Sequence, residues 1–274
     1  MKKILILGAS GTIGSAIFRC ASKQYQCWGT YNKNKPTDLD SRRIVQWDIQ
    51  DINTLSHLFA DISPDVVISS LTGDFETQIS AHKHIAESLS DMNTHMIFIS
   101  TANVFDGETD KPHAELDKPH PVSKYGKFKL ECEKMLQSML DERCLIVRIP
   151  KVMTREVANN FVFGKPVYRN LYASFNTSQN IAEAITECIR IQKQGVLHLS
   201  SDDFMSADMA CTLMGKSGYA VEDLTLNTYA GMMGCALADV KVSADGKFYF
   251  ALQSVDNISE RFAISCQDIM KKLN

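Results

Sequence analysis

The chain has 274 residues, of which 45% are hydrophobic and 22% are charged, and its formal net charge is −3. This composition is typical of a folded globular protein, and the near-neutral charge argues against nucleic acid as a partner. No apolar run approaches the roughly 20 residues that a membrane span needs, so no membrane partner is expected. The length allows one large domain, or one domain with a small appendage.

Two features argue against a secreted protein. The N-terminal segment MKKILILGAS is interrupted by glycine after a short apolar run, which indicates a first strand and not a signal peptide. The 8 cysteines form no CxxC pair, and several lie among apolar residues at helical spacing. Buried free thiols in a reducing compartment are the simplest interpretation, and the expected location is the cytoplasm.

Strand-like and helix-like segments alternate over the first 150 residues. Short apolar runs predict strands at 3–8, 26–31, 43–48, 64–70, 95–101 and 143–150. Apolar residues at helical spacing predict helices over 11–24, 52–62, 76–91 and 123–142. Strands that are apolar on both faces must be covered on both faces, so the pattern predicts a doubly wound parallel sheet of the α/β class.

The alternation weakens after residue 150. A helix is predicted over 178–194, a strand over 195–201 and another helix over 206–218. The remaining segment, 215–274, mixes patterns that do not assign its elements.

A glycine triplet lies between the first predicted strand and the first predicted helix, in LILGASGTIGSAIF. Glycine lets the backbone turn sharply and approach a pyrophosphate, and the N-terminus of the helix offers unpaired N–H groups to the anion. This context favours dinucleotide binding over a simple tight turn. The residues expected to contact the cofactor here are Gly8, Ser10, Gly11, Thr12, Ile13 and Gly14.

The segment after the second predicted strand indicates which dinucleotide is preferred. An NAD site usually has an acidic residue there, whereas this chain has Asn32, Lys33 and Lys35 in WGTYNKNKP. A 2′-phosphate would be attracted to this cationic turn, so NADP is the expected cofactor and NAD is the alternative. The lysines could equally belong to a solvated loop.

Two further strand ends complete the expected cofactor site. Asp48 and Ile49 end the third strand where the adenine amino group could be held; alternatively, Asp48 caps the helix that begins at Ile52. Ser69 and Ser70 end the fourth strand at the same edge of the sheet.

A tyrosine and a lysine stand four residues apart at the start of the predicted helix SKYGKFKLECEKML. Tyr125 and Lys129 therefore share a face of that helix. A phenol has a pKa of about 10, and a nearby ammonium lowers this pKa, so the phenol can exchange a proton with a carbonyl oxygen while Lys129 also holds the ribose. The strand HMIFIST delivers Thr101, a further hydroxyl, to the edge where such sheets place their sites.

In its motifs the chain resembles an extended short-chain dehydrogenase/reductase, most closely of the dTDP-4-dehydrorhamnose reductase type. The matching segments are GASGTIG, PDVVISS, ISTANVFDGE, ELDKPHPVSKYGKFKLECE and VRIP. The resemblance implies Thr101, Tyr125 and Lys129 as the catalytic residues, and reduction of a ketone on a nucleotide sugar with NADPH. It also implies a Rossmann domain over 1–150. The region 151–274 would partly complete the sheet and partly form a small substrate lobe, and a homodimer is one assembly that fits.

The chain departs from that family next to the catalytic threonine. The family has an Asp-Tyr pair where this chain has Ala102 and Asn103, and those positions are expected to face the substrate. Polar groups suited to a diphosphate follow in REVANNFVFGKPVYRN, namely Arg155, Asn159, Lys165 and Arg169. The small-molecule substrate is therefore expected to be a nucleotide sugar whose identity stays open.

Several other polar residues could belong to the site or to the fold. Arg148, at the end of a strand, could line the nicotinamide pocket or form a structural ion pair. His113 and His120 lie in a proline-rich loop and could contact the substrate, although exposure to solvent is the expectation. His82 and His84 are two residues apart on a helix and do not converge, so no metal site is expected.

Two other functions remain open from the sequence. One is a sugar-nucleotide epimerase with tightly bound NAD; a dehydratase is less favoured, because Ala102 and Asn103 replace the acidic pair that dehydratases carry. The other is a non-catalytic NADP-binding regulatory subunit, of the kind that serves methionine adenosyltransferase.

Overall fold

The structure is a computed structural model, and it describes residues 1–160 and 166–273. The chain folds into two compact units that interleave along the sequence. The first unit comprises residues 1–100, 131–147 and 178–196, and the second comprises 101–130, 148–177 and 197–274. The chain therefore crosses between the units several times.

A seven-stranded sheet organises the first unit, in the order β12-β7-β5-β4-β1-β2-β3. Strand β1 pairs in parallel with β2 and with β4, and the pairs β2–β3 and β4–β5 are parallel as well. This order confirms the doubly wound fold class. The strands are β1 (Lys3–Leu7), β2 (Gln26–Tyr31), β3 (Ile44–Gln46), β4 (Val66–Ser69), β5 (His95–Thr101), β7 (Cys144–Ile149) and β12 (Gly195–His198).

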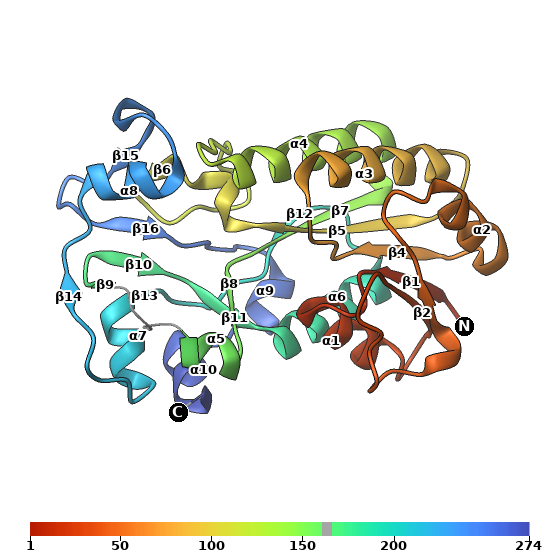
Figure 1. Ribbon diagram of the computed structural model, residues 1–274, viewed down its shortest axis with the longest axis horizontal. Coiled ribbons are helices and arrows are strands. Elements are labelled where there is room, and N and C mark those ends of the chain that lie inside the picture. The colour runs from red at the N-terminus through yellow and green to blue at the C-terminus, as the bar shows by residue number, and fades with distance from the viewer. Residues whose placement is uncertain (161–165, 274) are drawn as a thin grey trace. The chain divides into compact units, whose positions relative to one another are not determined.

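Helices cover both faces of this sheet, as its doubly apolar strands require. In Figure 1, α1 (Thr12–Ala21) and α6 (Ser178–Ile191) lie on one face, and α3 (Phe75–Ser90) and α4 (Lys124–Leu140) lie on the other. Helix α2 (Ile52–Ile62) packs beside α3. The strand residues from Ile4 to Leu7 and from Val66 to Ile68 are buried, so the core is the sheet itself.

In the described part of the second unit, short strands form four small sheets. One sheet joins β10 (Leu171–Ala173) to β13 (Met205–Ser206) and β16 (Phe248–Phe250). The three pairs are β8 (Lys151–Met153) with β11 (Phe175–Thr177), β9 (Val167–Tyr168) with β14 (Val221–Glu222), and β6 (Glu108–Thr109) with β15 (Lys241–Val242). Its helices are α5 (Arg155–Asn160), α7 (Ala207–Leu213), α8 (Leu226–Met233), α9 (Asn257–Arg261) and α10 (Cys266–Leu273).

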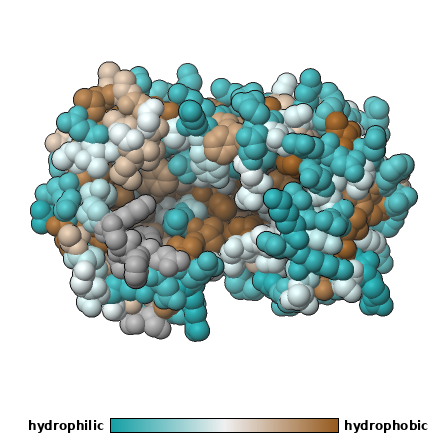
Figure 2. All heavy atoms as spheres, viewed as in Figure 1, coloured by the Kyte–Doolittle hydropathy of each residue, from teal (hydrophilic) through white to brown (hydrophobic). Residues whose placement is uncertain are grey.

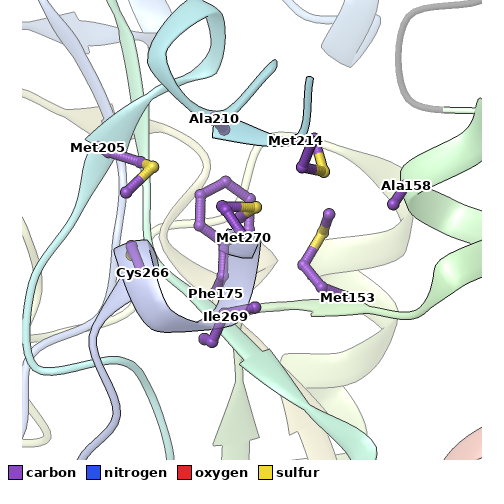
Figure 3. Close-up of a cluster of buried hydrophobic side chains, with 9 residues drawn as sticks. All are labelled: Met153, Ala158, Phe175, Met205, Ala210, Met214, Cys266, Ile269 and Met270. Carbon is purple, nitrogen blue, oxygen red and sulfur yellow. The ribbon is translucent and has the colours of Figure 1, made fainter. Parts of the chain in front are cut away.

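A sulfur-rich cluster forms one core of the second unit. Figure 3 shows four methionines and one cysteine surrounding the ring of Phe175, with side chains supplied by β8, β13, α7 and α10 among other elements. Methionine is flexible and polarisable, which suits a core where short elements meet at irregular angles. The cluster comprises Met153, Ala158, Phe175, Met205, Ala210, Met214, Cys266, Ile269 and Met270.

The cysteines are free thiols, and all but Cys235 are buried, in agreement with the burial that their apolar surroundings in the sequence predict. Hydrophilic side chains cover much of the face shown in Figure 2. Within residues 1–160 and 166–273, no helix is both long enough and apolar enough to cross a membrane.

Candidate functional site

The glycine loop of the first unit, residues 8–14, forms a concave turn that we call the glycine cradle. Its shape requires residues that have no side chain. Gly8 has φ of +85°, a region that other residues rarely adopt. A Cβ atom on Gly14 would lie 2.2 Å from the carbonyl oxygen of Gly8, so α1 can begin this close to the loop only with glycine there. Among the described residues, no side chain caps the N-terminus of α1. Its first N–H groups are therefore available to an anion such as a pyrophosphate.

A cavity of about 180 Å³ opens beside this cradle, wholly within the first unit. Its lining combines backbone from the loop with polar and aromatic side chains from the ends of β2, β3 and β4. The lining residues are Gly8, Ser10, Gly11, Thr30, Tyr31, Asn32, Asn34, Trp47, Ile49, Ser70, Leu71 and Thr72. The structure thus brings together six of the residues that the sequence predicts, and Thr12, Ile13 and Gly14 form the adjacent first turn of α1.

The turn after β2 presents amides to the cavity in place of ammonium groups. Asn32 and Asn34 line the cavity, whereas Lys33 and Lys35 are exposed and do not belong to its lining. Residues 32–34 form bends after β2, so the alternation of side chains along a strand does not apply to them. Nothing local in the sequence marks Asn34 as a lining residue.

Two aspartates in the segment that follows this turn, Asp38 and Asp40, accept hydrogen bonds from arginine side chains. Arg19 donates to Asp38 at 2.6 Å, and Arg42 donates to Asp40 at 3.2 Å. The bond from Arg42 is the leading cause that holds the pKa of Asp40 below its usual value. The lining residues include no acid and no base, so the described cavity offers only neutral donors and acceptors to a ribose or a phosphate.

Two residues that the sequence predicts to contact the cofactor, Asp48 and Ser69, do not line the cavity. Asp48 accepts from the backbone N–H of Gln50 at 2.9 Å, and it is Asp51 that caps α2, accepting from Thr54 N at 3.0 Å. The alternative role of Asp48 as the cap of that helix is therefore wrong, because Asp51 is the residue directly before the helix. Ser69 is fully buried and its hydroxyl bonds Nε2 of His82 at 2.8 Å, so it does not line the cavity.

The predicted catalytic residues lie together in the second unit. Thr101 ends β5, and Tyr125 and Lys129 both belong to the first turns of α4. A hydrogen bond joins the side chains of Thr101 and Tyr125. Tyr125 is 38% exposed and Lys129 only 5% exposed, with its Nζ 5.4 Å from the centre of the Phe128 ring. The phenol is therefore accessible, while the ammonium is largely withdrawn from solvent.

The pKa of Tyr125 is raised above its usual value of 10, chiefly by burial, and the hydrogen bond with Thr101 opposes this rise. The sequence predicts a lowered pKa because of Lys129, and in the chain by itself this expectation is wrong. Burial disfavours the phenolate more than the surrounding groups favour it. The phenol accordingly keeps its proton at neutral pH.

Glycine and asparagine bring α4 close to the end of β5. A Cβ atom on Gly126 would lie 2.3 Å from the carbonyl oxygen of Asn103, so only glycine allows this approach. Asn103 also holds Thr101 in place: the hydroxyl of Thr101 donates to Oδ1 of Asn103 at 2.9 Å and accepts from its backbone N–H at 3.3 Å. Ala102, the other predicted substrate residue, is buried in a cluster with Val104 and Phe105.

A buried carboxylate fixes the start of α4. Oδ1 of Asp106 accepts from Val122 N at 2.6 Å and from Ser123 N at 3.2 Å, and the hydroxyl of Ser123 donates to Oδ2. Ser123 in turn caps α4, because its Oγ accepts from Gly126 N at 3.0 Å. Tyr229 donates to the carbonyl oxygen of Asp106 at 2.8 Å. A serine before a helix is a known capping signal, but nothing local in the sequence marks Asp106 or Tyr229.

Arg148, His198 and His113 are buried and contact one another or the ring of Phe105. Arg148 is buried, its Nη1 lies 3.4 Å from Nε2 of His198, and it covers the ring of Phe105. Burial, supported by Arg148, lowers the pKa of His198 to about 4. His113 is buried and stacks on Phe105 at 4.4 Å, so its expected exposure is wrong, whereas His120 is exposed.

The described groups proposed for a diphosphate differ in their surroundings. Arg155 is exposed at the start of α5. Arg169 pairs with Asp223 at 2.7 Å, and Asn159 accepts from Lys216 at 3.4 Å. Lys165 lies outside the described residues.

Comparison with known proteins gives consistent relatives. A family model described as RmlD substrate binding domain matches residues 1–231. The beta subunit of methionine adenosyltransferase 2 from Bos taurus is 27% identical over 243 residues, which is 77% of this chain and 71% of that protein.

Solved structures match over nearly the whole chain. A dTDP-4-dehydrorhamnose reductase from Clostridium acetobutylicum is 20% identical, with a TM-score of 0.71 over 99% of this chain and 98% of that one. A dTDP-4-dehydrorhamnose reductase from Bacillus anthracis, solved in complex with NADP, is 14% identical, with a TM-score of 0.69 over 100% and 98% of the two chains. At these identities the likeness establishes the shared fold.

Proposed function

We propose that this chain, which belongs to the RmlD substrate binding domain family, is an NADP-dependent oxidoreductase that reduces a carbonyl group of a nucleotide-linked deoxysugar or a similar substrate. NAD is the alternative cofactor. The observation that carries the proposal is the hydrogen bond between Thr101 and Tyr125, one helical turn from the buried ammonium of Lys129. A partly exposed phenol with a hydroxyl partner suits proton transfer to a carbonyl oxygen.

The glycine cradle supports dinucleotide binding. A side chain on Gly14 would collide with Gly8, so glycine at this position lets the helix begin next to the loop. The backbone of the loop and of the first helical turn can then bind an anion. The adjoining cavity supplies Trp47 and Ile49 as apolar walls, and Ser10, Asn32 and Asn34 as polar ones. We assign the pyrophosphate to the N-terminus of α1 and the adenosine to this cavity.

The roles of the catalytic residues follow from their surroundings. A bound reduced nicotinamide would supply a hydride for the carbonyl carbon. Tyr125 holds the proton on its Oη, because burial keeps its pKa high, and it donates this proton to the carbonyl oxygen. For Thr101 to orient that oxygen, its hydroxyl proton must turn from Oδ1 of Asn103 to the carbonyl oxygen. The charge of Lys129 stabilises the phenolate that remains.

The proposal also covers the substrate lobe, the compartment and the assembly. The second unit holds Thr101, Tyr125 and Lys129, so it is a suitable place for a substrate lobe formed mainly by residues 151–274. The free thiols fit a reducing compartment such as the cytoplasm. Arg155 is exposed and remains our candidate for a substrate phosphate, and a homodimer remains the assembly to test.

Removal of the phenolic oxygen of Tyr125 tests the proposal. Tyr125→Phe should lower kcat by at least about a hundredfold, since general acid catalysis contributes factors of this size or greater. The dissociation constant of NADPH should change less than about threefold, because the phenol is not part of the cavity lining. Steady-state kinetics on a panel of nucleotide-linked ketosugars, with parallel cofactor titration, provides both numbers. Full activity in Tyr125→Phe would remove the proposed role.

The relative from Bos taurus supports a second candidate, a cofactor-binding regulatory subunit without its own turnover. Co-purification with a methionine adenosyltransferase catalytic subunit, together with inactivity on every carbonyl substrate, would support it. The Tyr125→Phe variant then separates the two candidates, because a regulatory subunit would keep both its partner and its effect on that partner.

A further inference from the structure

A buried carboxyl group lies on α4, about two helical turns after Tyr125. Glu133 is 1% exposed, and it accepts a hydrogen bond from the hydroxyl of Ser100, which is 2% exposed. Ser100 directly precedes Thr101 at the end of β5. We propose, on the premise of the proposed reductase function, that Glu133 is a positioning residue. By holding Ser100, it fixes the end of β5 so that Thr101 meets Tyr125.

Stability alone does not explain why Glu133 is buried. It lies on α4 beside Cys132, Leu136 and Leu140, which are buried as well. Removing a carboxyl group from water costs free energy that an apolar side chain of similar size would not cost. Burial, with a contribution from Glu133, raises the pKa of the Cys144 thiol to about 12, so the carboxyl group acts electrostatically on β7 too. A carboxyl group that stays this deep is explained by the hydroxyl that it holds.

The end of β5 extends beyond one of its neighbouring strands. The register of β5 with β4 runs from His95 to Phe98, so residues 99–101 continue past that pairing. Ser100 lies in this extension, and its hydrogen bond to Glu133 attaches the strand end to α4. Hydrogen bonds to carboxyl groups are strong in surroundings of low polarity. The bond therefore supports the strand where its pairing with β4 has stopped.

The bond also lies where the two elements that carry the proposed catalytic residues leave the first unit. That unit includes β5 as far as residue 100 and α4 from residue 131 onward. Thr101 is the next residue along the strand, and Tyr125 lies further toward the start of the helix. Because an extended strand and an α-helix are both stiff over such lengths, the bond between Ser100 and Glu133 limits how far Thr101 can move from Tyr125. The hydrogen bond between those two side chains is the contact that it preserves.

Ser100→Ala removes the donor and leaves the carboxyl group in place. At saturating NADPH and substrate, we expect kcat to fall by at least about tenfold, because small displacements of catalytic groups have effects of this size. The dissociation constant of NADPH should change by less than about twofold, since neither Ser100 nor Glu133 lines the cofactor cavity. An unchanged kcat in Ser100→Ala would overturn the proposal.

Thr94→Val is the matched control for a general loss of stability. Thr94 is also buried, just before the opposite end of β5, and its hydroxyl donates to the carbonyl oxygen of Pro64 at 2.7 Å. The variant should lower the urea midpoint about as much as Ser100→Ala does, while kcat stays within about twofold of wild type. If kcat falls equally in both variants, lost stability and not lost positioning explains the effect, and the proposal is wrong.

Two variants of Glu133 test the acceptor. Glu133→Gln keeps an oxygen that can accept from Ser100, whereas Glu133→Leu does not. We expect kcat to be at least about fivefold higher in Glu133→Gln than in Glu133→Leu, because one hydrogen bond is worth a factor of this order. Equal kcat values in two folded variants would contradict the proposed role of the bond.

A measurement that needs no turnover separates a failed link from a failed reductase function. In protein labelled with fluorotyrosine, the fluorine NMR resonance of Tyr125 is the one that Tyr125→Phe removes. Ser100→Ala should shift this resonance, and Thr94→Val should leave it in place. If the shift occurs but no nucleotide-linked ketosugar is reduced, the reductase function is wrong and the link from Glu133 to Tyr125 is supported. A resonance that does not move in Ser100→Ala would show that the link is absent.

Discussion

The glycine cradle of the first unit and the Thr101–Tyr125 region of the second unit hold their functional groups in opposite ways. In the cradle, backbone N–H groups and carbonyl groups face the cavity, and glycine makes room for them. Around Tyr125, side chains tie the backbone in place: Asp106 binds the two residues before α4, Ser123 caps the helix and Asn103 holds Thr101. The first arrangement depends on open space beside the backbone, and the second is fixed by polar side chains.

Because of this difference, the two regions should tolerate different substitutions. A site built from backbone fails when volume is added and survives the loss of nearby polar groups. A site fixed by buried polar side chains fails when an acceptor is removed, because the donors it served remain buried without partners. Three sets of variants test this contrast.

Asp106→Ala has the largest expected effect on stability. The carboxylate serves two backbone N–H groups and the hydroxyl of Ser123, so its loss leaves three donors unpaired. We expect the free energy of unfolding to fall by roughly 2–4 kcal/mol, as measured by urea denaturation. The activity that remains should also fall, because α4 carries Tyr125.

Ser123→Ala is the matched control for that variant. It removes the cap of α4 but keeps the two bonds from Asp106 to backbone, so it should cost about 1 kcal/mol. If the two variants are equally destabilised, the carboxylate of Asp106 contributes no stability beyond the cap. The statement that buried polar side chains fix this region would then be wrong.

Gly14→Ala tests the cradle by adding a single methyl group. Its Cβ would lie 2.2 Å from Gly8 O and 2.6 Å from Oγ of Ser70, so the loop or the helix must shift. We expect a loss of about 1–3 kcal/mol in stability and at least a tenfold loss of NADPH affinity, followed by the fluorescence of Trp47 in the cavity wall. Gly11→Ala should leave stability nearly unchanged, since its Cβ would have one neighbour at 3.5 Å. A Gly14→Ala protein that binds NADPH normally would show that the cradle does not contact the cofactor.

The two regions also differ in how far the sequence predicts them. Short apolar runs and helical spacing in the first unit predict β2 at 26–31, α2 at 52–62 and β5 at 95–101 with their observed bounds. The fold class follows because strands that are apolar on both faces have few other solutions. The glycine spacing predicts the cradle because a positive φ and a close approach both require that residue.

The second unit resists prediction for a physical reason. Strands such as β9, β13 and β15 have two residues each, too few to show a period, and they pair with partners far along the chain. Asp106 binds Ser123 from 17 residues away, and Tyr229 binds Asp106 from 123 residues away, through contacts that no local pattern records. The pKa of Tyr125 depends on burial that only the folded structure reveals.

Asn34→Asp has the smallest expected effect and tests the neutral lining of the cavity. A carboxylate at Asn34 would repel a 2′-phosphate, which carries nearly two negative charges, and could accept a hydrogen bond from the ribose hydroxyl of NAD. We expect the ratio of NADPH to NADH affinity to fall by about tenfold, a difference of roughly 1.4 kcal/mol. Lys33→Gln and Lys35→Gln change exposed side chains outside the lining, so their effect on that ratio should be smaller and should vanish at high salt. A lysine variant that shifts the ratio more than Asn34→Asp does, at high salt, would mean that ammonium groups and not amides contact the cofactor.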